Sequence, residues 1–144
     1  MAKDVPGDNN CQFHALADQL AYSGWPGWKA MTVRQQCVSW LKANADTLMD
    51  DDGIGEPTRL RDAVGVGNWN SYINDMLKHG TTWGDEATLL AAAVLFKAEI
   101  FVISSVSENS MHTVEPPPSW RIKCERRLVI GHYHEYHYIS TRKR

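Results

Sequence analysis

Apolar residues recur at helical spacing through the first two thirds of the chain. Between Cys11 and Ala21 they fall at positions i, i+3, i+4 and i+7, the spacing of one buried face of an α-helix. The same pattern predicts further helices over residues 32–41, 69–77 and 85–96, and a short helix is expected over 59–63, where the pattern weakens. The stretch between residues 46 and 67 is rich in Asp and Gly, so outside its short helix we expect a solvated loop.

Capping residues indicate where three of these helices begin. A cluster of turn formers over residues 6–10 ends at Cys11, so we expect this cysteine at or next to a helix N-terminus. Thr32 has Gln35 three residues later, the spacing of a capping box. Asp85 is a good N-cap for the helix that follows it.

The last third of the chain changes to short β-branched and aromatic runs. The run from Glu99 to Ser104 follows a helix directly, which is typical of a buried central strand. Further strands are predicted over residues 111–115, 128–130 and 135–140, with a proline break at 116–118. Helices followed mostly by strands favour an α+β domain or a three-layer α/β domain.

The composition fits one domain over residues 1–144. With 43% apolar and 22% charged residues, the chain is expected to form a core without disulfide bonds or a bound metal ion. A net charge of −2 gives no basic surface for nucleic acid, so that partner is not expected. The longest apolar run, Leu89 to Phe96, is far shorter than the roughly 20 residues that span a bilayer. We therefore expect a soluble chain without membrane contact, and we also expect a monomer.

Three cysteines, Cys11, Cys37 and Cys124, leave at least one free thiol and suit a reducing compartment. At a helix N-terminus, unpaired N–H groups and the helix dipole favour the Cys11 thiolate, which makes Cys11 a candidate nucleophile. The N–H groups of Asn10 and Cys11 are candidate donors to an oxyanion. The alternative is a small buried hydrophobic residue at a helix start. Cys37, on an apolar stripe, and Cys124, among charges, are expected to be non-catalytic.

A cysteine nucleophile needs a base, and residues 131–138 contain three histidines. In an extended strand His132 and His134 share one side, while Glu135 and His137 share the other. Zinc bound by His132 and His134 is a competing interpretation, but no nearby spacing supplies a third ligand.

Three blocks resemble the ovarian tumour (OTU) domain cysteine proteases. Residues 6–16, Pro-Gly-Asp-Asn-Asn-Cys-Gln-Phe-His-Ala-Leu, are similar to the family signature Asp-Gly-Asn-Cys-x-Phe-Arg-Ala. Residues 82–89, which begin Thr-Trp-Gly-Asp, are similar to its Trp-Gly-Asp/Gly motif. Residues 135–140, Glu-Tyr-His-Tyr-Ile-Ser, are similar to its terminal His-Tyr-Asn-Ser block. The blocks occur in family order and span nearly the whole chain.

The resemblance implies a papain-like α+β fold with a small, mostly antiparallel central sheet between helical layers. It implies a thiol protease, without metal or organic cofactor, that cleaves after the C-terminal Gly-Gly of ubiquitin or a ubiquitin-like modifier. Cys11 is the implied nucleophile and His137 the implied base, while Trp83 and Gly84 shape a channel for the Gly-Gly tail. The alternative role for Trp83 is an anchor in the core. Action is expected in the cytoplasm, the nucleus or, for a pathogen effector, the host cytosol.

Two positions depart from the family pattern. Asn9 stands where Gly is usual, and Asn tolerates left-handed backbone angles better than most residues. Ile139 stands where Asn or Asp often orients the imidazole, and an aliphatic side chain accepts no hydrogen bond. We expect Asp8 as the third catalytic member, with Glu135 in reserve; organising the oxyanion loop is the alternative role for Asp8. Losing an orienting group lowers a rate without abolishing it. Activity is therefore predicted, with a weak or inactive ubiquitin-binding module as the alternative.

Overall fold

The computed structural model describes residues 2–3, 10–46, 59–64, 67–77, 84–104, 111–117, 120–133 and 137–141. Within these ranges, helices are α1 (Cys11–Tyr22), α2 (Ala30–Ala43), α3 (Leu60–Val64), α4 (Trp69–Leu77) and α5 (Glu86–Leu95). The strands are β1 (Ala2–Lys3), β2 (Ala98–Ser104), β3 (Met111–Val114), β4 (Arg126–Tyr133) and β5 (His137–Thr141). None of the described helices is long and apolar enough to span a membrane.

The strands form one sheet in the order β1-β5-β4-β2-β3. Only β2 and β4 pair in parallel, while the other three pairings are antiparallel. The predicted α+β class with a mostly antiparallel sheet is therefore confirmed. β1 was not predicted, because a two-residue strand has no hydrophobic pattern, and its residues pair with Ser140 and Thr141 at the opposite end of the chain.

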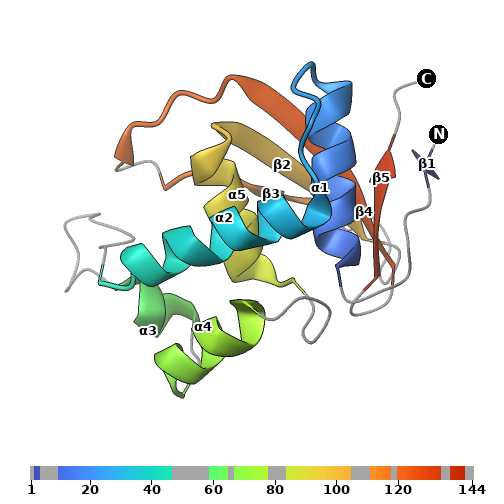
Figure 1. The fold of residues 1–144 in the computed structure, drawn as a ribbon. Helices are drawn as coiled ribbons and strands as arrows, with labels where there is room; N and C mark the ends of the chain where they lie inside the picture. Colours follow the sequence, from blue (N-terminus) through green and yellow to red (C-terminus); the bar gives the residue numbers. More distant parts are fainter. Residues whose placement is uncertain are drawn as a thin grey trace.

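Helices cover one face of this sheet (Figure 1). α1 contacts β4 and β5, α5 contacts β2 and β3, and α2 packs across α1 and α5. The buried face of the sheet is apolar, and its central residues Ile100, Val102, Leu128 and Ile130 are fully buried. On the other face of β2, Phe101 is half-buried and Ile103 is exposed. The described helices therefore form their layers on one side of the sheet, and not on both sides as the resemblance implied, because the other face of β2 carries the half-buried Phe101 and the exposed Ile103. α1 lies directly beside the last strand.

The helix starts were predicted with mixed success. α1 begins at Cys11 as expected, and Asp85 caps α5 in a capping box with Thr88. The capping box expected at Thr32 is wrong. α2 begins at Ala30, and its first helical bond runs from the Val33 N–H to the Lys29 carbonyl. Lys29 makes no side-chain capping bond, so the sequence carries no capping signal at the true start.

Candidate active site

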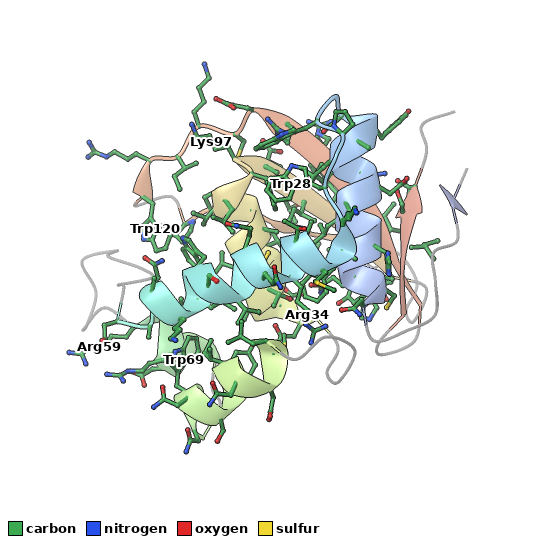
Figure 2. All side chains as sticks on the ribbon, in the orientation of Figure 1. Trp28, Arg34, Arg59, Trp69, Lys97 and Trp120 are labelled. Carbon is green, nitrogen blue, oxygen red and sulfur yellow. The ribbon has the colours of Figure 1, made fainter. Side chains whose placement is uncertain are left out.

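Cys11 is the first residue of α1, and a buried arginine supports the residue before it. Asn10 is the N-cap, but its side chain makes no capping bond. Its Oδ1 instead accepts from Arg34 Nη1 at 2.8 Å, while Arg34 Nε donates to the Met76 carbonyl at 2.7 Å. The guanidinium also lies over the Phe13 ring, 5.0 Å from its centroid. Arg34 thus ties the start of α1 to the end of α4, as its position in Figure 2 shows.

The Cys11 sulfur lies against the last strand. The backbone N–H of Tyr138 donates to Cys11 Sγ at 3.3 Å, across 127 residues of sequence. Tyr138 directly follows His137, so the fold places the backbone of the predicted base next to the predicted nucleophile. An N–H bond to sulfur favours the thiolate, as does the N-terminus of α1. Cys11 is 1% exposed, so its sulfur is buried in this structure.

Several predicted site residues lie outside the described part of the structure. These are Asp8, Trp83, His134 and Glu135, together with the side chain of His137. His132 is described, and its ring stacks on Tyr138 with centroids 4.4 Å apart and planes 2° from parallel. Among the described residues, no three His, Cys, Asp or Glu side chains lie close enough together to hold a metal ion.

The other two cysteines lie in surroundings that disfavour a thiolate. Cys37 in α2 is fully buried, and this burial raises its pKa far above the usual range. Burial also raises the pKa of Cys124, and the carboxylates of Glu99 and Glu115 raise it further. Of the three thiols, Cys11 is the one that lies at a helix N-terminus and accepts a hydrogen bond from a backbone N–H.

Comparison with known proteins agrees with this geometry. A family model described as OTU-like cysteine protease matches residues 6–138. The chain belongs to this OTU family. It is 32% identical over 136 residues to the OVARIAN TUMOR DOMAIN-containing deubiquitinating enzyme 9 of Arabidopsis thaliana, covering 94% of this chain and 34% of that protein. Its identity to enzyme 11 of that plant is 31% over 136 residues, covering 94% of this chain and 47% of that protein. The chain thus spans less than half the length of either.

Solved OTU structures share the fold at low sequence identity. The OTUD1 OTU domain has a TM-score of 0.72 at 14% identity, with 96% of this chain and 83% of that chain covered. An OTU deubiquitinase from Wolbachia pipientis wMel, solved bound to ubiquitin, has a TM-score of 0.65 at 14% identity, with 97% and 93% covered. These likenesses confirm the expected OTU fold.

A buried polar network connects two of the OTU blocks. Gln12, the residue after the nucleophile, is fully buried, and its Nε2 donates to the Asp85 carbonyl at 3.2 Å. Thr88 Oγ1 donates to Gln12 Oε1 at 2.6 Å. Tyr138 is also hydrogen-bonded with Gln12, while burial raises the Tyr138 pKa to about 12. The network therefore reaches Tyr138, whose N–H contacts the sulfur. Sequence reasoning missed it, because a capping pattern at Asp85 shows nothing of a partner in α1.

Gly84 is buried against this network, which leaves no room for a side chain at this position. A Cβ atom added at Gly84 would lie 2.6 Å from Gln12 Cδ, far inside contact distance. Gly84 was predicted to shape a channel for the substrate's Gly-Gly tail. The contact described here is instead a packing contact with Gln12 inside the protein. Glycine at this position lets the Gln12 amide pack against the backbone.

Replacing Gly84 with alanine is therefore expected to displace Gln12 and break its bonds to Asp85 and Thr88. Overpacking of this kind lowers the free energy of unfolding by about 1–3 kcal/mol. Urea denaturation measures the change. Gly67→Ala is the matched control, because a Cβ at Gly67 meets no atom within 4 Å. Equal stability of both variants would contradict the packing argument.

Proposed function

We propose that this OTU domain is a deubiquitinating cysteine protease, which hydrolyses the isopeptide or peptide bond after the C-terminal Gly-Gly of ubiquitin or a ubiquitin-like modifier. The observation that carries the proposal is the 3.3 Å bond from the Tyr138 N–H to Cys11 Sγ. It brings the residue next to His137 to a thiol at a helix N-terminus. The names of the Arabidopsis relatives and the ubiquitin bound to the Wolbachia enzyme support the choice of substrate.

The proposed reaction follows from these groups. His137 takes the Cys11 proton, and the thiolate attacks the carbonyl carbon of the terminal glycine to form a carbon–sulfur bond. The N–H groups of Asn10 and Cys11 stabilise the oxyanion. The carbon–nitrogen bond then breaks as His137 returns the proton to the departing amine. Water, activated by His137, hydrolyses the thioester and releases the modifier.

In this proposal Asp8 orients the His137 imidazole, and Trp83 and Gly84 admit the Gly-Gly tail. Ile139 is 6% exposed, and its side chain packs closely over Gly131. The position two residues after the base thus offers an apolar contact in place of a hydrogen-bond acceptor. This observation favours the second candidate, a ubiquitin-binding OTU module with weak or no catalysis.

A ubiquitin probe with a C-terminal electrophile distinguishes the two candidates. We expect the wild-type protein to form a covalent adduct at Cys11, located by peptide mass spectrometry, and Cys11→Ala to form none. Because Cys11 is 1% exposed, iodoacetamide, which brings no binding energy to open the site, is expected to react with it far more slowly than the probe. A protein that binds ubiquitin but forms no adduct would favour the non-catalytic module.

A further inference from the structure

A single buried amide joins α1 to the last two strands. Gln19 is 3% exposed, on the face of α1 that packs against the sheet. Its Nε2 donates to Ser140 Oγ at 2.9 Å and to the Thr141 carbonyl at 2.6 Å. Its Oε1 accepts from the Val129 N–H of β4 at 2.9 Å. Both donor hydrogens and the acceptor of the amide are therefore bonded to strands.

Polar contacts join α1 to β5 near both ends of the strand. Near its start, the Tyr138 N–H donates to Cys11 Sγ, and Gln12 is hydrogen-bonded with Tyr138. Near its end, Gln19 Nε2 donates to Ser140 Oγ and to the Thr141 carbonyl, and Ser140 Oγ donates to Asp18 Oδ2. From Cys11 to Gln19 the helix rises about 12 Å, and from Tyr138 to Thr141 an extended strand advances about 10 Å. The two segments therefore run side by side in the same direction, with a polar contact near each end.

These hydrogen bonds fix the position of α1 along the sheet, which the surrounding apolar packing does not. Apolar burial depends on area and has no preferred direction, so it allows a helix to slide along a sheet. A hydrogen bond requires a separation near 3 Å and a narrow range of angles. The pairing of β4 with β5 fixes the two strands relative to each other. The Gln19 amide, bonded to both, fixes α1 relative to the pair.

We propose that Gln19 is a positioning residue for the reaction: it sets the height of α1, and so of Cys11, relative to β5, which carries His137. The proposal rests on the roles proposed above for Cys11 and His137. It also gives a function to Ser140, the last residue of the terminal block, whose hydroxyl accepts from Gln19 and donates to Asp18 Oδ2.

The test compares two variants that each remove polar contacts of β5. Gln19→Leu removes the three bonds that the Gln19 amide makes to β4 and β5, and it leaves the other bonds between α1 and β5 in place. Thr141→Val removes the 2.8 Å bond from Thr141 Oγ1 to the Val129 carbonyl. This bond joins β5 to β4 within the sheet, so the variant keeps the bonds between α1 and the strands. The kinetic constants kcat and KM are measured on a fluorogenic amide of ubiquitin across pH, together with the melting temperature of each variant.

We expect Gln19→Leu to lower kcat by about 10–100-fold, since a displacement near 1 Å at reacting groups costs up to about 100-fold. KM stays within about twofold, because the substrate surface is unchanged. The acid limb of the kcat/KM profile moves to higher pH, because the thiolate and imidazolium stabilise each other less when they are misaligned. Thr141→Val melts at a lower temperature but keeps the wild-type kcat and profile.

The proposal is overturned if Gln19→Leu, corrected for its folded fraction, keeps the wild-type kcat and acid limb. It is also overturned if Thr141→Val loses kcat to the same extent, since the effect would then be general destabilisation. If Gln19→Leu fails to fold, Ser140→Ala removes one of the three Gln19 contacts together with the bond from Ser140 Oγ to Asp18 Oδ2, both of which join α1 to β5. A several-fold loss of kcat then supports the proposal, and an unchanged kcat overturns it. An inactive wild-type protein refutes the proposed function itself. An active wild-type protein whose variants keep the wild-type kcat refutes only the role of Gln19.

Discussion

Replacing Cys11 with serine is expected to lower kcat/KM on a ubiquitin substrate by about 10⁴-fold or more. Serine has nearly the same shape, so the helix start and the packing against Tyr138 are kept. Its hydroxyl, however, does not ionise near neutral pH, whereas the α1 N-terminus and the Tyr138 N–H act by stabilising a thiolate. Cleavage of a fluorogenic ubiquitin amide measures the loss, and circular dichroism checks that the fold is retained.

Cys124→Ser makes the same chemical change at a thiol with a raised pKa. Because a thiolate is disfavoured there, this variant is expected to keep kcat/KM within about twofold of the wild type. Substantial activity in Cys11→Ser, or a large loss in Cys124→Ser, would move the nucleophile away from the start of α1.

Replacing Arg34 with methionine is expected to cause the largest loss of stability among single changes near the site, about 2–5 kcal/mol in the free energy of unfolding. Arg34 is 1% exposed, and the change removes its bonds to Asn10 Oδ1 and to the Met76 carbonyl, together with its contact over Phe13. Hydrogen bonds made by buried charged groups are worth more than neutral ones. Chemical denaturation followed by tryptophan fluorescence gives the value.

Arg61→Met is the matched control for this measurement. Arg61 Nη2 lies 2.6 Å from Asp46 Oδ1, but the two side chains are 43% and 66% exposed, and such pairs contribute little in water. We expect its effect to stay below about 1 kcal/mol. Arg34→Lys should recover only part of the stability, because an ammonium cannot bond both partners with the planar fork of a guanidinium. Equal effects of the two methionine variants would refute the role assigned to Arg34.

Local signals in the sequence predicted most of the secondary structure. α1, α5 and β2 were predicted because their periodicity and capping lie within a few residues. The start of α2 was missed because Lys29 caps it with its backbone alone. The assignment of Cys11 came from a local feature, the expected helix start. The choice of His137 over its neighbours came only from family resemblance.

The supporting contacts of the site were beyond sequence reasoning for a physical reason. Gln12 and Asp85 are 73 residues apart, and Gln19 and Thr141 are 122 residues apart. A buried glutamine at an apolar helix position shows only that partners must exist, because a buried amide is costly without them. Which strand supplies those partners depends on the tertiary fold.

The two residues of the proposed catalytic pair come from opposite ends of this domain, and β1 pairs with β5 beside them. During translation the nucleophile helix leaves the ribosome long before the strand that completes the site. A nascent chain therefore carries its thiol without its partner strand and lacks the proposed catalytic pair until synthesis of this domain is nearly finished. In the proposed mechanism, premature termination anywhere before the last strand yields a product without protease activity.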